Sequence, residues 1–173
     1  MTHESFRKSG ERIQSRTSMD TFAWIVTAAV LVFFVTEMIS LVPRIEDGQT
    51  VTHHIFIVVL LFILLAYSYA VIPYGYAIED GKLRILRPFM TKEIPLSSIS
   101  KVTLVKRMPS LRVFGIGGLF GYYGYYWFPN RAFGFVLARN GKNLILIDST
   151  VSRPILISPD DDRFLASLGN VTI

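Results

Sequence analysis

The stretch TFAWIVTAAVLVFFVTEMISLV, residues 21–42, decides the architecture, because it is an apolar run of 22 residues with a single acidic side chain. A second apolar run, IFIVVLLFILLAYSYAVI, follows at residues 55–72. An α-helix rises about 1.5 Å per residue, so each run can cross a hydrocarbon core of about 30 Å, the second only just. The sequence therefore predicts a transmembrane helical hairpin over residues 21–72, with a polar outer loop at 43–54.

The basic residues around the two runs predict which way the hairpin faces. Lysine and arginine are enriched on the cytoplasmic side of membrane spans. They are frequent before the first run and after the second, whereas the connecting loop has only Arg44. We therefore expect a two-pass protein whose N-terminal segment, residues 1–20, and whose C-terminal part both lie in the cytoplasm.

The composition excludes several kinds of site. The chain of 173 residues contains no cysteine, which rules out disulfides, thiolate metal ligands and a thiol nucleophile. The hydrolase motif G-x-S-x-G and the zinc motif H-E-x-x-H are both missing from the sequence. The net charge is +5, but the basic residues are scattered and tethered to a membrane, so nucleic-acid binding is not expected.

Glu37 is the one acidic residue inside an apolar run. It lies about five residues from the outer end of the first run, which is some 8 Å at the rise of a helix, so it can reach water. One interpretation is a glutamate near the membrane interface. The other pairs Glu37 with His53 or His54, at the start of the second run, as a proton or metal site.

The pattern changes at residue 73, where short strand-like segments separated by turns replace the continuous apolar runs. Asp80-Gly81 and Asn140-Gly141 each stand between two such segments, and these dipeptides favour the tight primed turns of β-hairpins. Residues 73–173 are therefore predicted to form a cytoplasmic domain with an antiparallel sheet of six or seven strands.

A short helix is expected at the end of the chain, in SPDDDRFLASLGN. Ser158 is a candidate N-cap, Pro159 suits the first helical position, and Asp160 to Asp162 complement the positive end of the helix dipole. Gly169 is expected to end the helix, which would pack over the open end of the sheet. The predicted fold class is a membrane-anchored α+β protein.

Three segments of this domain resemble a known family. GGLFGYYG at 117–124, NLILI at 143–147 and ISPDD at 157–161, in this order and spacing, are similar to the bacterial pleckstrin-homology (PH) domain family. The resemblance covers about residues 74–170. It implies a small PH-like β-barrel or sandwich with a C-terminal capping helix, often attached to membrane helices, in the plasma membrane of a bacterium. It also implies no established catalytic residues and no cofactor.

The glycine-rich and aromatic stretch GIGGLFGYYGYYWFPN, residues 115–130, permits three interpretations. Its rings could fill the core of the domain, insert into the membrane interface, or form an edge that binds a protein partner. Basic residues flank it, so an anionic surface would be attracted. The candidate contacts with membrane or partner are Lys106, Arg107, Arg112, Phe120, Tyr122, Tyr123, Tyr125, Tyr126, Trp127 and Arg131.

A second basic group lies on the first predicted hairpin. Lys82, Arg84 and Arg87 are candidate contacts for an anion, although alternation along a strand is also typical of a solvated face. Together these features favour a non-enzymatic module that docks a protein partner or senses lipid at the cytoplasmic leaflet. The alternative is a membrane enzyme or transporter component that uses Glu37 with His53 and His54. A homo-oligomer is compatible with either function.

Overall fold

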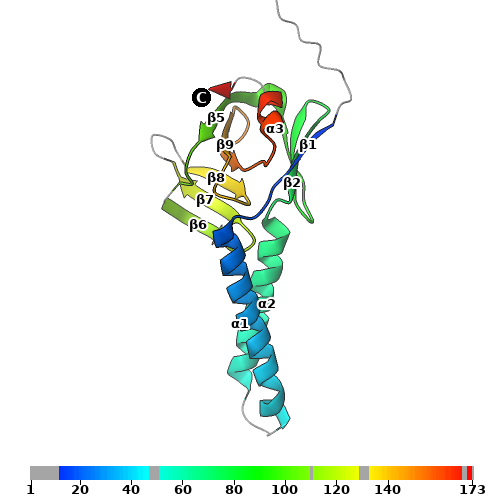
Figure 1. Cartoon of the computed structure of the whole chain (residues 1–173), viewed down its shortest axis with the longest axis vertical. Helices are drawn as coiled ribbons and strands as arrows, with labels where there is room; N and C mark the ends of the chain where they lie inside the picture. The colour runs from blue at the N-terminus through cyan, green and yellow to red at the C-terminus, as the bar shows by residue number, and fades with distance from the viewer. Residues whose placement is uncertain (1–11, 47–50, 110, 129–132, 169–170, 173) are drawn as a thin grey trace, which may run out of the picture.

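The computed structural model describes residues 12–46, 51–109, 111–128, 133–168 and 171–172. Two helices, α1 (Thr21–Glu46) and α2 (Thr52–Val71), lie side by side and project from one end of a β-sheet domain (Figure 1). Both helices are long and apolar enough to cross a membrane, and most of their large apolar side chains are exposed. This is the anchor that the two apolar runs predict.

The helices extend beyond the apolar runs at the end remote from the domain. Pro43 lies inside α1, and both His53 and His54 lie in the first turn of α2 instead of in the loop. Helix ends depend on backbone hydrogen bonds, which continue past the last apolar side chain: the amide of Ile55 donates to the carbonyl of Val51 at 3.0 Å. The connection between the helices is therefore shorter than predicted.

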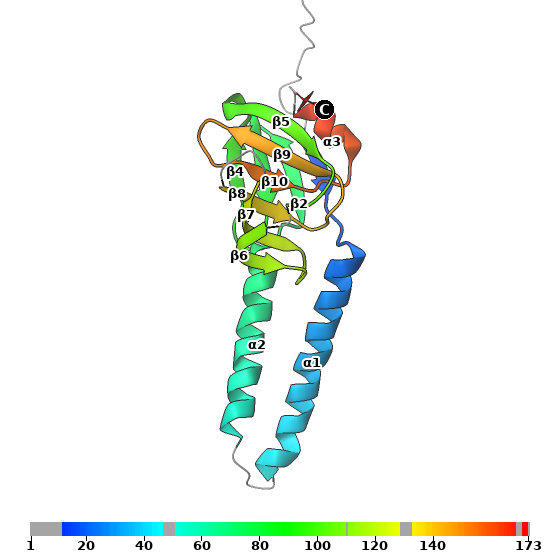
Figure 2. The same cartoon turned by 90° about the vertical axis from the view of Figure 1, so that its left-hand side faces the viewer.

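The domain consists of two sheets that face each other as a sandwich (Figures 1 and 2). The first sheet has four strands in the order β1-β2-β3-β4, and the second has the order β11-β5-β9-β10-β8-β7-β6. The strands are β1 (Ile13–Arg16), β2 (Gly75–Glu79), β3 (Lys82–Leu86), β4 (Lys92–Pro95), β5 (Ile99–Val105), β6 (Leu111–Gly117), β7 (Tyr122–Trp127), β8 (Phe133–Ala138), β9 (Leu144–Ser149), β10 (Ile155–Ile157) and β11 (Val171–Thr172). A 3₁₀ turn at Leu96–Ser98 joins the two sheets between β4 and β5.

Strand β1 comes from the segment that precedes the first helix, where the sequence predicts no strand. It pairs with β2 in antiparallel register, from Ile13 opposite Ile78 to Arg16 opposite Gly75. The chain therefore begins the sandwich, leaves it for the two helices, and returns to the strand next to β1.

The two predicted hairpin turns have different outcomes. Asp80 and Gly81 adopt the positive φ angles of a primed turn, 51° and 69°, and join the paired strands β2 and β3 as expected. Asn140-Gly141 does not form a hairpin, because β10 lies between β8 and β9, antiparallel to β9 and parallel to β8. Strand β11 is also parallel to its neighbour β5, so the prediction of a purely antiparallel sheet is wrong at two pairs.

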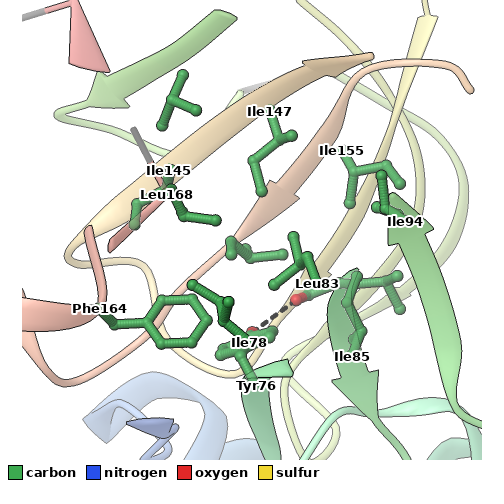
Figure 3. Packing of buried hydrophobic residues seen from close by; sticks show 13 residues of the cluster. Tyr76, Ile78, Leu83, Ile85, Ile94, Ile145, Ile147, Ile155, Phe164 and Leu168 are labelled. Atoms are coloured by element: carbon green, nitrogen blue, oxygen red, sulfur yellow. Dashed lines mark hydrogen bonds between the residues drawn. The ribbon is translucent and has the colours of Figure 1, made fainter. Parts of the chain in front are cut away.

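The core fills the space between the sheets (Figure 3). Apolar side chains from both sheets meet there, and α3 (Asp162–Ser167) adds Phe164, which is fully buried. Tyr76 is the largest fully buried side chain among the described residues, and its hydroxyl donates to the carbonyl of Leu137 at 2.7 Å across the sandwich. Burial raises the pKa of Tyr76 to about 12. The sheets do not close into a barrel, so the sandwich form of the predicted fold is the correct one.

The C-terminal helix is present, but its start differs from the prediction. Asp161 is the N-cap and accepts a hydrogen bond from the amide of Arg163 at 2.9 Å. Ser158 is fully buried instead, and its hydroxyl accepts a hydrogen bond from the amide of Arg139 at 2.9 Å. The buried amide of Arg139 needs an acceptor, which Ser158 provides, and the helix begins after Asp161 instead. Gly169, the predicted end of the helix, lies outside the described residues.

Candidate functional site

The glycine-rich stretch forms a hairpin of β6 and β7 at the end of the sheet nearest the helices (Figure 2). Gly115 and Gly124 face each other in this hairpin, with φ angles of 132° and 136°. A Cβ atom on Gly115 would lie 2.1 Å from the carbonyl oxygen of Tyr123, and one on Gly124 would lie 2.1 Å from that of Phe114. The two backbones therefore approach more closely than any side chain permits, which explains the glycine requirement without a ligand.

The turn of the hairpin binds the start of α1. The amide of Phe120 donates to the hydroxyl of Thr27 at 2.8 Å, and a Cβ atom on Gly118 would lie 3.0 Å from the ring of Phe22. Next to the turn, the hydroxyl of Tyr122 donates to the Asp20 carboxylate at 2.9 Å. Burial raises the pKa of Tyr122 above its ordinary value, and the Asp20 carboxylate adds to the increase.

Asp20 is the central residue of this joint between helix and domain. Besides Tyr122, its carboxylate accepts hydrogen bonds from the amides of Ala23 and Gly141, both at 2.8 Å. The first caps α1, and the second holds the loop between β8 and β9. The side chain of Asn140 adds a bond to the carbonyl of Ser18 at 3.2 Å, so the Asn-Gly sequence serves the joint instead of a hairpin turn.

The hairpin also contacts α2. The ring of Phe120 lies 6.0 Å from that of Tyr69, and the ring of Tyr123 lies 6.3 Å from that of Tyr67, both edge to face. The aromatic stretch thus divides among three environments. Tyr126 and Phe128 are buried in a second apolar cluster, Phe120, Tyr122 and Tyr123 lie at the joint, and Tyr125 and Trp127 are exposed.

Strand β6 carries an apolar surface for which the sequence gives little signal. Leu111, Val113 and Phe114 are 60%, 53% and 74% exposed, and we call them the β6 edge because β6 is the last strand of its sheet. A cavity of about 450 Å³ separates part of this edge from Leu64 and Tyr67 of α2. Three apolar residues within four, LRVF, are the signal that could have been noticed, but the alternation is broken by a bulge between Arg112 and Phe114.

The candidate basic residues before and within β6 have separate surroundings. Lys106, Arg107 and Arg112 are exposed. Burial raises the pKa of Tyr126, and the neighbouring guanidinium of Arg112 opposes that increase. Arg131 lies outside the described residues.

The structure does not bring the three basic residues of the first hairpin together. Lys82 and Arg84 form ion pairs with Glu93 at 2.8 Å and 3.0 Å, and Arg84 is also paired with Glu79. The hydrogen bond from Lys82 is the main reason that the pKa of Glu93 is lowered. Arg87 lies apart from them at the end of β3, where its Nε donates to the carbonyl of Met90 at 3.0 Å.

Glu37 and His54 meet between the two helices. His54 Nδ1 lies 3.0 Å from Glu37 Oε2, and both side chains are largely shielded. The ring of His53 lies 4.0 Å from that of His54. Within the described part of the chain, no group of three or more histidine, cysteine or acidic residues is arranged to hold a metal ion.

These observations define a class of protein: a β-sandwich with a C-terminal capping helix, fixed at one end to an apolar helical hairpin. Residues 74–171 match the family model of the bacterial PH domain, which is more than half of the chain. The chain belongs to the bacterial PH domain family. The match begins after α2, so strand β1 lies outside it. Comparisons with curated proteins and with solved structures give no match.

Proposed function

We propose that this protein is a non-enzymatic binding module of the cytoplasmic leaflet, whose β6 edge lies in the interfacial layer of the membrane. The observation that carries the proposal is the exposure of Leu111, Val113 and Phe114 beside α2. Contiguous exposed apolar side chains are unfavourable in water and mark contacts with a membrane or a partner. Strand β6, which carries them, is on the side of the domain that adjoins the apolar helices (Figure 2).

The depth of the contact follows from its neighbours on α2. Leu64 lies seven residues before Val71, the end of the helix, which corresponds to about 10 Å. The unpaired backbone groups of an edge strand are costly in hydrocarbon, so β6 belongs among the headgroups, with its apolar side chains directed inward. The ring contacts of Tyr67 and Tyr69 are typical of that layer.

Charge supports the same orientation. Arg112 is exposed on β6 itself, and Lys106 and Arg107 are exposed in the connection that leads from β5 to β6. Each basic residue close to an anionic surface contributes about 1 kcal/mol of attraction. The basic residues before α1 and after α2 favour the cytoplasmic side for the domain. The domain would thereby be held against the leaflet from which it reads a lipid or presents a surface to a partner.

The β6 edge also resembles a site where a partner strand could add to the sheet. The bulge between Arg112 and Phe114 interrupts the regular ladder and makes that mode less favourable. The pair of Glu37 and His54 lies at the other end of the helices and has no third ligand among the described residues. We assign it to the packing of the helices, not to catalysis.

Fluorescence quenching by brominated lipids tests the proposal. A tryptophan is introduced by Phe114→Trp in the full chain, with Trp24→Phe and Trp127→Phe removing the native tryptophans, and the protein is placed in nanodiscs. We expect lipids brominated near the headgroup end of the acyl chain to quench this tryptophan strongly. Leu104→Trp is the matched control, because Leu104 is also exposed but lies on β5, five strand spacings or about 24 Å along the sheet. Equal quenching of the two positions, or none at Phe114→Trp, would refute the membrane contact.

A further inference from the structure

Three cationic side chains surround a second cavity, on the same face of the sheet as Tyr123. Arg87 comes from the end of β3, Lys92 from β4 and Arg153 from the loop between β9 and β10. The rings of Tyr125 and Phe135 form the wall between them, and the cavity has a volume of about 320 Å³. We call these five residues the cationic pocket.

Two of the three cationic side chains contact the aromatic wall and leave donors available. Lys92 Nζ lies 5.6 Å from the ring centre of Phe135, and the guanidinium of Arg153 lies 5.7 Å from that of Tyr125. The two rings are themselves in edge-to-face contact, with centres 4.9 Å apart. A cation above a ring face is oriented by the ring but retains N–H groups for a ligand.

The balance of charge is what distinguishes this pocket from the basic face next to it. Lys82 and Arg84 are neutralised by Glu79, Asp80 and Glu93. Among the described residues that line the cationic pocket there is no carboxylate. Glu93 follows Lys92 in the chain, but successive side chains of a strand point to opposite faces, and Glu93 pairs with Lys82.

Positive charges lie close together in the cationic pocket, which is electrostatically unfavourable. Burial lowers the pKa of Lys92, and the positive charge of Arg87 lowers it further. A bound anion would remove this repulsion and accept hydrogen bonds from several donors at once. Folding thus prepares a site that is complementary to a compact, multiply bonded anion.

We propose that the cationic pocket binds a phosphate group. Its position makes a phospholipid headgroup the first candidate source. Tyr123 contacts Phe135 of the pocket on one side, at 5.0 Å, and Tyr67 of α2 on the other. One ring, that of Tyr123, therefore separates Phe135 of the pocket from Tyr67 of α2. The assignment to a lipid rests on the membrane contact proposed above, whereas the affinity for phosphate does not.

Native mass spectrometry of the full chain, released from neutral detergent with defined lipids, tests the lipid source. We expect the protein to retain phosphatidylglycerol in preference to phosphatidylcholine, and Lys92→Gln to reduce that preference by about tenfold, the effect of losing one charge-assisted bond. Lys142→Gln is the control, since Lys142 is exposed in the loop that binds Asp20 at the joint but is remote from the pocket. It removes the same charge and should leave the preference within about twofold.

Calorimetric titration with pyrophosphate in the same neutral detergent separates the two sources. Binding of pyrophosphate that Lys92→Gln and Arg153→Gln each weaken by about tenfold, without any lipid preference, would support the phosphate site and assign it to a soluble ligand. Equal effects of Lys92→Gln and Lys142→Gln, or binding of neither probe, would overturn the proposal. Quenching at Phe114→Trp does not depend on the pocket, so failure of this inference and failure of the membrane contact can be distinguished.

Discussion

At the scale of single residues, Tyr76 links the two sheets through one hydroxyl group. It donates to the carbonyl of Leu137 and accepts from the amide of Ser158 at 3.1 Å, both inside the core. Removal of the hydroxyl breaks both hydrogen bonds, and a buried backbone group that is left without another partner costs about 1–3 kcal/mol. Buried polar contacts therefore contribute to the stability of the domain, in addition to its apolar packing.

Tyr76 also predicts how stability depends on pH. A tyrosine ionises near pH 10 in the unfolded chain, whereas burial raises the pKa of Tyr76 to about 12 in the folded domain. Its contribution is complete below pH 10 and is lost as the pH rises from 10 to 12, because the unfolded state releases its proton first; the loss is about 2–3 kcal/mol.

The measurement is chemical unfolding of the full chain in detergent at pH 8 to 12, compared with Tyr76→Phe. We expect the variant to be less stable at pH 8 but to lose less stability on going to pH 12. Parallel profiles for the two proteins would show that Tyr76 is not the group responsible.

At the scale of elements, β1 is a part of the sandwich that sequence patterns missed. The segment IQSR has one apolar residue in four and gives no strand signal. Its position depends on distant contacts instead: the hydroxyl of Thr17 donates to the carbonyl of Ser158 at 2.7 Å, and Ser15 accepts from the amide of Asp161 at 3.1 Å. Both hydroxyl groups are buried.

We predict that residues 74–173 alone are less stable than the same residues with 12–18 joined to their N-terminus through a flexible linker. The linked form restores the β1–β2 pairing and buried hydrogen bonds worth about 1 kcal/mol each, so the difference should be at least 2 kcal/mol. Unfolding by urea measures it. A third form with Ser15→Pro in the linked segment removes a strand donor and should lose most of the gain; equal stability of all three would contradict the role of β1.

The same scale shows why some elements could be predicted and others could not. Apolar length alone specifies α1 and α2, and Asp80-Gly81 specifies its hairpin because nothing else competes for that turn. Asn140-Gly141 carries an equally strong local signal, but its polar groups bind residues 18–20 and Asp160, and β10 takes the place beside β8. Local patterns cannot report contacts between residues more than a hundred positions apart.

The prediction of site residues is limited in the same way, because local sequence patterns do not report distant contacts. The aromatic stretch is evident in the sequence, but its division among core, joint and exposed surface depends on the register of β6 and β7. The sequence places Arg87 with Lys82 and Arg84, because the three are close along the chain. In the folded chain it joins Lys92 and Arg153, because the acidic partners of the other two lie on the opposite face of the strands.

At the scale of the whole molecule, the orientation of the domain on its helices depends on Asp20. Its carboxylate accepts hydrogen bonds from the amide of Ala23 in the first turn of α1, from the hydroxyl of Tyr122 and from the amide of Gly141. Asp20→Ala should therefore loosen the joint without unfolding the core. We expect a loss of about 2–4 kcal/mol in the stability of the joint, since two charge-assisted bonds and a helix cap are removed.

Hydrogen exchange of the full chain in nanodiscs measures this change. The amides of Gly141 and Phe120 should exchange faster by about thirtyfold or more, which corresponds to about 2 kcal/mol, whereas amides of β9 should be unaffected. Lys142→Ala, whose side chain is exposed next to Gly141, is the control. Faster exchange throughout the domain would mean that Asp20 stabilises the sandwich as a whole instead of the joint.

The place of β1 in the chain also determines the order of events during synthesis. Strand β1 leaves the ribosome first, but β2 follows only after residues 17–74, a stretch that contains both helices. In the proposed two-pass arrangement, the first sheet can close only when its two ends have returned to the same side of the bilayer. A folded sandwich would thus show that both helices have crossed, because a chain with only one helix inserted would leave β1 and β2 on opposite sides and open to proteolysis.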